Sequence, residues 1–179
     1  SFHTVLNTIL QTRKMGFNLK INTVLMKGYN DDEILNFVNF SAVHEIEVRF
    51  LEAMKIGQIV SQQDSLFVSA QAAIEKIKEK YELTPITEME PDSTSFNFST
   101  KEGANIGFIA SESRPFCGSC SRWRLSANGM LRACLMSERG VNLKDLKKSE
   151  LTLKLAELLG MKPKSRIKEI HQDMHAIGG

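Results

Sequence analysis

The chain has 179 residues, 42% of them hydrophobic and 25% charged, which is the composition of a globular protein long enough to bury a core. Its 23 basic and 21 acidic side chains leave a formal net charge of +2, which excludes nucleic-acid binding driven by bulk electrostatics. The sequence contains neither a long apolar run nor an opening basic segment followed by an apolar stretch, so it predicts no membrane span and no signal peptide. We therefore expect a cytoplasmic protein in which any anion site is a local cluster of cations.

The first part of the chain alternates helical and strand-like patterns. Apolar residues at helical spacing predict a helix that ends at Gly16, and residues 17–28 and 45–54 have the β-branched or alternating pattern of strands. A helix is predicted after Asn30, a candidate N-cap, and another over about residues 69–81. This order is typical of stacked βα units and predicts an α/β fold with a parallel sheet or barrel.

The alternation stops at Thr84. Residues 84–115 have little helical pattern and one predicted strand, over residues 104–110. We expect a domain boundary near residue 84, which divides the chain into residues 1–83 and 84–179. A short helix is predicted from Ser149, as N-cap, to Gly160.

All three cysteines lie in the segment FCGSCSRWRLSANGMLRACL, residues 116–135. The spacing of Cys117 and Cys120 lets two sulfurs bind one metal centre, and the Asn-Gly pair at 128–129 predicts a hairpin that returns Cys134 toward them. An odd number of cysteines cannot all pair internally, and a reducing compartment disfavours disulfides. The thiols are therefore expected to be metal ligands rather than disulfide partners.

Three kinds of cysteine site remain open from the residues alone. A zinc site requires a fourth ligand, and the nearest histidines, His171 and His175, lie far downstream. Inert buried cysteines fit poorly with the neighbouring serines, arginines and asparagine. An iron–sulfur cluster held by three cysteines best explains the odd count, because one iron is then free for a non-protein ligand.

Four arginines and no acidic residue lie between Ser113 and Cys134. These residues are Arg114, Arg122, Arg124 and Arg132. Guanidinium groups lower thiol pKa values and bind phosphate through two hydrogen bonds, although a solvated basic hairpin would look the same in the sequence. On a strand, Arg122 and Arg124 would share one face and Trp123 the other.

This cysteine segment resembles the cluster motif of the molybdenum cofactor biosynthesis protein A family, the radical S-adenosylmethionine (SAM) enzymes known as GTP 3',8-cyclases. The segments KINTVLMKGYNDDE, VRFLEAMKIG and GFIASESRPFC, and the terminal Met-x-x-Ile-Gly-Gly, resemble the same family. The resemblance spans nearly the whole chain and is weakest over residues 59–100. It implies late βα units of an incomplete TIM-like (β/α) barrel over residues 1–83, and a small α+β domain with an iron–sulfur cluster over residues 84–179.

The resemblance also implies a role for individual residues. The ligands of a second, substrate-side 4Fe-4S cluster, whose free iron contacts the guanine of GTP, would be Cys117, Cys120 and Cys134. The other GTP-binding residues would be Lys20, Arg122, Trp123 and Arg124. Met54 would contact SAM, and Gly178 and Gly179 would form a C-terminal tail that supports catalysis.

The implied reaction converts GTP to (8S)-3',8-cyclo-7,8-dihydroguanosine 5'-triphosphate, an early step of molybdenum cofactor biosynthesis. A radical SAM enzyme also needs a first cluster on a Cys-x3-Cys-x2-Cys motif, and this sequence has none. Since the chain also opens in mid-pattern at Ser1, we expect a C-terminal portion that is inactive alone. The intact enzyme would take electrons from a reductant such as flavodoxin or ferredoxin, and a homodimer is compatible with the family.

Some residues depart from the family pattern or stay unassigned. Lys55 stands where the family usually has proline, and Asn128 where it has aspartate. Glu47, Arg49 and Glu52 are candidates for an ion-pair set inside the barrel. Two other functions are kept open, a zinc-bearing module that binds nucleic acid and a different radical SAM enzyme with an auxiliary cluster.

Overall fold

The computed structural model of the chain describes residues 1–87, 93–144 and 146–178. Its residues form two compact units. The first comprises residues 1–53 and 65–114, and the second comprises residues 54–64 and the chain from Pro115 onward. Within the described residues, no helix is long and apolar enough to cross a bilayer.

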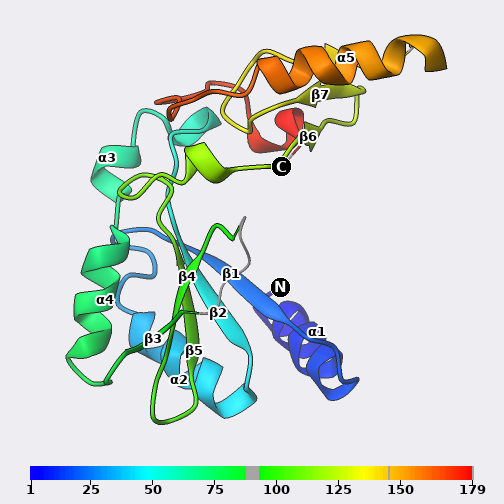
Figure 1. The fold of residues 1–179 in the computed structure, drawn as a ribbon. Coiled ribbons are helices and arrows are strands. Elements are labelled where there is room, and N and C mark those ends of the chain that lie inside the picture. Colours follow the sequence, from blue (N-terminus) through cyan, green and yellow to red (C-terminus); the bar gives the residue numbers. More distant parts are fainter. Residues whose placement is uncertain (88–92, 145, 179) are drawn as a thin grey trace. The chain divides into compact units, whose positions relative to one another are not determined.

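A five-stranded sheet with the strand order β1-β2-β5-β4-β3 forms the centre of the first unit (Figure 1). The parallel strands are β1 (Lys20–Leu25), β2 (Glu47–Glu52) and β5 (Asn105–Ile109). The antiparallel strands are β4 (Phe96–Ser99) and β3 (Thr84–Ile86). The expected α/β class is confirmed, and the three longest strands lie where the sequence predicts them, but the sheet is mixed rather than wholly parallel.

The two compact units do not coincide with the expected domains 1–83 and 84–179. Residue 84, the expected boundary, is the first residue of β3, and β3 and β4 extend the same sheet that contains β1 and β2. Stacking of Phe96 on Phe108, at 5.7 Å between ring centroids, fixes β4 to the common core. Strands β3, β4 and β5 therefore belong to the first unit, because they complete its sheet.

Helices cover one face of this sheet. They are α2 (Ile34–His44) and α4 (Ala70–Lys78), and the buried core between helices and sheet includes Val38 and Ile77 from the helices and Val48, Phe50 and Phe108 from the strands. The Ser69 hydroxyl caps α4 by accepting a hydrogen bond from the Ala72 N–H. The short α3 (Gln63–Leu66) precedes α4 in the chain.

The turn before α2 differs from the sequence prediction. The N-cap residue of α2 is Glu33, not Asn30. The Asn30 side chain instead accepts a hydrogen bond from the Met26 N–H at 2.9 Å and donates one to the Val24 carbonyl at 3.0 Å. Asn30 thus closes the turn that follows β1, a role that suits asparagine as well as helix capping does.

The predicted first helix is present as α1 (Phe2–Lys14), but its apolar stripe is not buried. Phe2 and Val5 are 73% and 59% exposed, and no residue of α1 falls in the buried class. Together with Phe37 and Phe40 of α2, the stripe lines an apolar hollow. The apolar spacing therefore predicted the helix correctly, but the apolar face of this helix is not buried in the core.

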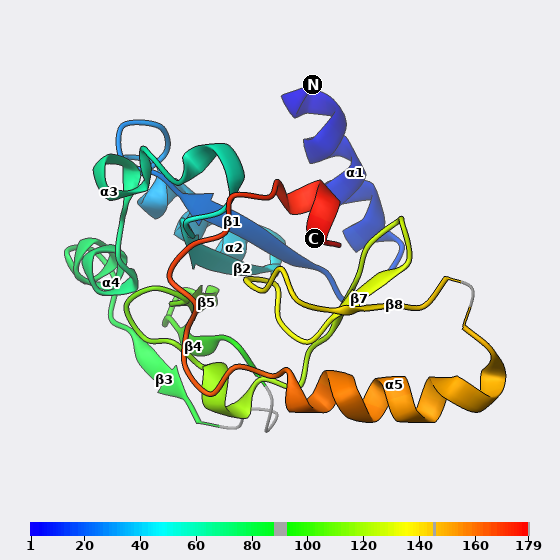
Figure 2. The ribbon, with the colours of Figure 1, turned by 90° about the horizontal axis from the view of Figure 1, so that it is seen from above.

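The second unit contains a small antiparallel sheet packed against a helix, as both views show (Figures 1 and 2). Its strands are β6 (Arg124–Leu125), β7 (Met130–Arg132) and β8 (Val141–Asn142), and the helix is α5 (Lys148–Gly160). Leu131, Val141 and Leu158 form the core between them. The hairpin predicted from Asn128 and Gly129 is confirmed as the β6–β7 turn.

A second apolar cluster in this unit joins distant parts of the chain. It contains Ile56, Met136, Ile170 and Ile177. The short 3-10 helices of the unit are η1 (Gly57–Ile59), η2 (Cys117–Ser119) and η3 (Met174–Ile177), of which η3 carries Ile177 into this cluster. The C-terminal segment is therefore part of the packed unit.

Candidate functional site

The second unit holds all three cysteines near one another. Helix η2 forms a tight turn between Cys117 and Cys120, with the Cys120 N–H donating to the Cys117 carbonyl at 3.4 Å. Strand β7 then leads to Cys134, whose side chain packs against the cluster around Ile170. All three are free thiols with partly buried side chains. The three cysteines that the sequence predicts to share a site therefore lie in one unit, on the loop that contains η2 and just after β7.

The thiols influence one another electrostatically. Burial raises the pKa of the Cys117 thiol, and negative charge on Cys134 and Cys120 raises this pKa further, against the opposing effect of nearby cations. Burial also raises the pKa of the Cys120 thiol, but the Arg122 N–H, the Arg122 guanidinium and the Lys162 ammonium offset it, so the net pKa is lowered. The cations around Cys120 therefore stabilise its thiolate form, whereas neighbouring negative charge destabilises the thiolate form of Cys117.

The three thiols have the chemistry of iron–sulfur cluster ligands, but their side chains are not arranged as a preformed metal site. Among the described residues, no three His, Cys, Asp or Glu side chains are gathered tightly enough to form a metal site. His171 and His175 are both exposed, and His171 lies 3.5 Å from Glu169. Three partly buried thiols beside cationic side chains suit an anionic cluster with one non-protein ligand better than a four-coordinate structural zinc.

A lysine that the sequence did not single out contacts this loop. The Lys162 ammonium lies 3.7 Å from the Cys120 sulfur, and it donates to the Arg122 carbonyl at 2.8 Å and to the Ala133 carbonyl at 3.0 Å. Lys162 is 28 positions beyond Cys134, outside the motif, so no local pattern could have identified it.

The four arginines are divided between the two units. Arg114 belongs to the first unit, where its guanidinium lies 5.0 Å from the Phe96 ring centroid. In the second unit, Arg122 precedes β6 and stacks over Phe116 at 5.3 Å, whereas Arg124 lies within β6. The two arginines therefore do not lie on one strand, because β6 begins only at Arg124.

Two further residues of this basic segment, Trp123 and Arg132, pack within the second unit. Trp123 packs against the core formed by the small sheet and α5. Arg132, the cross-strand partner of Arg124, is 5% exposed and donates to Ser126 Oγ and Gln172 Oε1, each at 3.2 Å. Arg132 is thus a packed side chain of the hairpin, while Arg122 and Arg124 retain partial exposure.

A polar group around Lys20 lies in the first unit, on the sheet face opposite α2 and α4. The Lys20 ammonium is 3.4 Å from Glu47 Oε2, and Glu47 Oε1 accepts from Arg49 Nε at 2.5 Å and from Asn97 Nδ2 at 2.8 Å. The predicted ion pairing is confirmed for Glu47 and Arg49. The Lys20 side chain is 45% exposed, so its ammonium is accessible to an anion.

The electrostatics of this group centre on Glu47. Burial raises the pKa of the Glu47 carboxyl, but hydrogen bonds from Arg49 and Asn97 and the charges of Arg49 and Lys20 outweigh it and hold the pKa below its ordinary value. The Asn97 Oδ1 atom is buried and has no hydrogen-bond partner within the described residues. Glu52, which the sequence grouped with this set, is instead hydrogen bonded elsewhere, to Ala70 and the segment after β5.

Met54 and the C-terminal tail belong to the second unit. Met54 is partly buried against the Ile56–Ile170 cluster. Gly178 follows η3 with φ of 81°, and a β-carbon there would lie 2.6 Å from the Leu125 carbonyl oxygen, so the tail lies directly against the backbone of β6. Gly179 lies outside the described residues.

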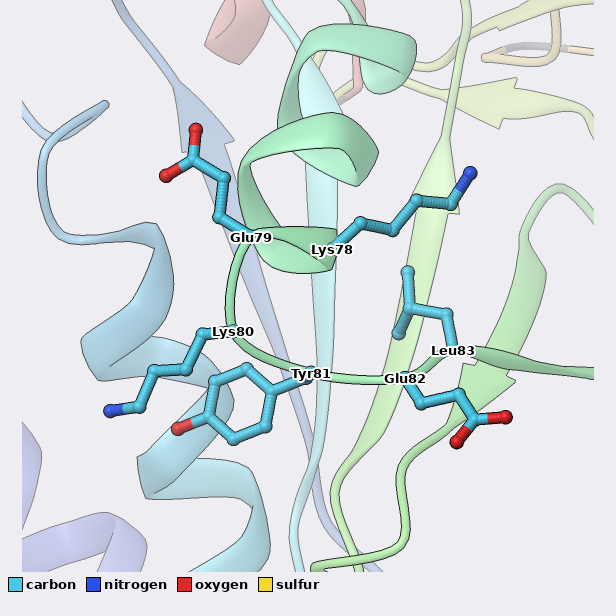
Figure 3. Close-up of a pocket in the computed structure, with 6 residues that line it drawn as sticks. All are labelled: Lys78, Glu79, Lys80, Tyr81, Glu82 and Leu83. Carbon is cyan, nitrogen blue, oxygen red and sulfur yellow. The ribbon is translucent and has the colours of Figure 1, made fainter.

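A hollow in the first unit lies where the chain leaves α4 and is lined by residues 78–83. Figure 3 shows the charged side chains Lys78, Glu79, Lys80 and Glu82 pointing away from one another there. Because these groups do not converge, this hollow offers no binding geometry.

Comparisons with known proteins point to one family. Residues 46–172 match the profile of the family described as Molybdenum Cofactor Synthesis C. A protein named GTP 3',8-cyclase from Synechocystis sp. is 46% identical over 177 residues, which cover 99% of this chain and 54% of that relative. Proteins of the same name from Aquifex aeolicus and Clostridium botulinum are 37% and 44% identical, over 79% and 71% of this chain. These matches cover 44% and 39% of the two relatives, so the chain spans about half, or less, of the curated relatives it matches.

Proposed function

We propose that this chain, which belongs to the Molybdenum Cofactor Synthesis C family, is the C-terminal part of a GTP 3',8-cyclase. The observation that carries the proposal is the similarity over 99% of the chain to the Synechocystis protein of that name. The three free, mutually interacting thiols of the second unit support it independently. The reaction would convert GTP to (8S)-3',8-cyclo-7,8-dihydroguanosine 5'-triphosphate, early in molybdenum cofactor biosynthesis.

Cys117, Cys120 and Cys134 would bind a substrate-side 4Fe-4S cluster. When bound, such a cluster supplies an iron without a protein ligand, to which the guanine base can coordinate. Arg122 and Arg124 are partly exposed, and their guanidiniums would bind the phosphates of GTP.

The first unit would be part of an incomplete TIM-like barrel. Three parallel strands with helices on one face and a polar group on the other are the pattern expected of such a barrel, whose interior carries the polar residues of the site. Lys20, half exposed and oriented by Glu47, would bind GTP from this face. Met54 would contact SAM.

Turnover would require more than this chain supplies. SAM cleavage needs a first cluster on a Cys-x3-Cys-x2-Cys motif, which the sequence lacks, together with a reductant such as flavodoxin or ferredoxin. We therefore propose that the 179 residues alone do not turn GTP over. Gly178 and Gly179 would act in the full-length enzyme as a tail that supports catalysis.

The cluster assignment is tested by the iron, sulfide and zinc content of the anaerobically reconstituted full-length protein and of this chain. We expect about four irons per chain on these 179 residues, and in both samples an electron paramagnetic resonance spectrum of the reduced cluster that changes when GTP is added. A Cys134→Ser variant of the chain should lose this signal. About one zinc per chain, with no iron and no response to GTP, would contradict the proposal and favour a zinc-bearing module.

The GTP assignment is tested by Arg124→Ala in the full-length protein. Loss of a charged hydrogen bond to phosphate should weaken GTP binding by about 1.5–3 kcal/mol, measured by calorimetry. Arg139→Ala is the matched control, because Arg139 is an exposed arginine of the same unit. Equal affinities for the two variants would remove Arg124 from the phosphate site.

A further inference from the structure

Lys162 joins the two halves of the cysteine loop. Its ammonium donates to the Arg122 carbonyl at 2.8 Å on one side and to the Ala133 carbonyl at 3.0 Å on the other, and it lies 3.7 Å from the Cys120 sulfur. The Arg122 carbonyl belongs to the segment that contains Cys120, and the Ala133 carbonyl immediately precedes Cys134. These three acceptors use all three N–H donors of the ammonium.

The position of Lys162 is fixed by α5. Leu158, near the end of that helix, is fully buried in the core with Leu131 and Ala133. The helix ends at Gly160, and the Lys162 N–H donates to the Leu159 carbonyl at 3.2 Å. The lysine therefore extends from a packed element, and its ammonium supplies a charged donor to both the Arg122 and the Ala133 carbonyl.

We propose that Lys162 is a positioning residue of the cysteine loop, which holds the segments of Cys120 and Ala133 together and donates a hydrogen bond to the Cys120 sulfur. The inference deepens the proposed function, since the consequence of this hydrogen bond depends on a cluster bound by Cys120. Hydrogen bonds to cluster sulfurs and nearby positive charge both stabilise the more negative, reduced state. Lys162 therefore raises the reduction potential of that cluster.

Two variants and one control separate these effects in the full-length protein. Lys162→Met keeps most of the length of the side chain but removes its positive charge and its hydrogen-bond donors. Lys162→Arg keeps the positive charge and the donors. Lys164→Met is the control, because Lys164 is an exposed lysine two positions away. Each protein is studied without metal by hydrogen–deuterium exchange and, after reconstitution, by a redox titration followed by electron paramagnetic resonance.

We expect Lys162→Met to increase exchange in residues 120–124 and 131–135 and to shift the midpoint of the substrate-side cluster to lower potential. Lys162→Arg should keep the midpoint nearer the wild-type value, and Lys164→Met should change neither readout. If Lys162→Met fails to fold, Lys162→Arg is compared with the wild type instead, and a midpoint or exchange pattern far from the wild type would then contradict the proposal. An unchanged midpoint in Lys162→Met would overturn the role toward the cluster, and unchanged exchange would overturn the tie between the two segments.

The two proposals fail in different ways. Absence of iron from the reconstituted wild-type protein would refute the proposed cluster and with it the effect on potential. The exchange measurement on metal-free protein would still decide whether Lys162 holds the loop. Normal iron content with a midpoint insensitive to Lys162→Met would refute only the role of Lys162.

Discussion

The buried carboxylate of Glu52 accepts a hydrogen bond from the Ala70 backbone N–H at 2.8 Å, at the first residue of α4. Its other oxygen accepts from the N–H groups of Glu112 and Ser113, each at 2.8 Å, and the Ser113 hydroxyl also donates to the carboxylate. With Glu52 only 4% exposed, one carboxylate joins the end of β2, the start of α4 and the segment after β5. Three backbone N–H groups and one hydroxyl thus donate to the two oxygens of a single side chain.

We expect Glu52→Gln to lower the free energy of unfolding by about 3 kcal/mol, because an amide NH2 would face backbone N–H donors in place of an acceptor. Urea denaturation followed by circular dichroism measures this loss. Glu102→Gln is the control, since Glu102 is exposed in the same unit, and it should change stability by less than about 0.5 kcal/mol. A loss below about 1 kcal/mol for Glu52→Gln would show that the second acceptor oxygen contributes little to stability.

The Glu47 carboxyl should make the first unit sensitive to acid. Its pKa is lowered in the folded chain from the ordinary value of 4.5, so below that pH the unfolded chain binds more protons. The stabilisation is therefore complete above 4.5 and is lost as the pH falls toward the folded pKa. Urea denaturation at a series of pH values should give a steeper decline below about pH 4.5 for the wild type than for Glu47→Gln. Parallel declines would mean that other carboxylates dominate.

Local signals in the sequence predicted most of the fold. Apolar periodicity located the main helices and parallel strands, and the Asn-Gly pair located the β6–β7 hairpin. Helix α5 begins at Lys148 rather than after Ser149, because the Glu150 carboxylate accepts from the Lys147 N–H and so makes Lys147 the N-cap. Strands β3 and β4 were missed because they are short, and Pro85 in β3 argued against a strand.

The candidate site was predictable only where its residues are close in sequence. Cys117, Cys120 and Arg124 belong to one recognisable segment. Lys162 and Arg132 gain their significance from partners about 40 positions away, which no local pattern indicates. Burial of Arg132 in particular is a tertiary effect, since a charged residue on a short hairpin strand is usually exposed.

Arg132 and Gln172 should stabilise the second unit as a pair. The guanidinium Nη2 donates to Gln172 Oε1 at 3.2 Å and joins β7 to the segment before η3. In a double-mutant cycle with Arg132→Met and Gln172→Ala, we expect a coupling energy of about 1 kcal/mol in urea denaturation. Arg132→Met combined with Gln71→Ala, on α4 of the other unit, should give a coupling near zero. A coupling near zero in both cycles would mean that the hydrogen bond contributes nothing to stability.

Gly178 should tolerate no side chain. With φ of 81° and only 2.6 Å between the position of an added β-carbon and the Leu125 carbonyl oxygen, Gly178→Ala must move the tail away from β6. We expect faster hydrogen–deuterium exchange in residues 170–178 and, under the proposed function, a loss of turnover of about 100-fold in the full-length enzyme with GTP affinity retained. Gly160→Ala is the control, because apart from its own helix turn no atom lies within 4 Å of its β-carbon position. An equal loss of turnover and of GTP affinity would instead make the tail part of the binding site.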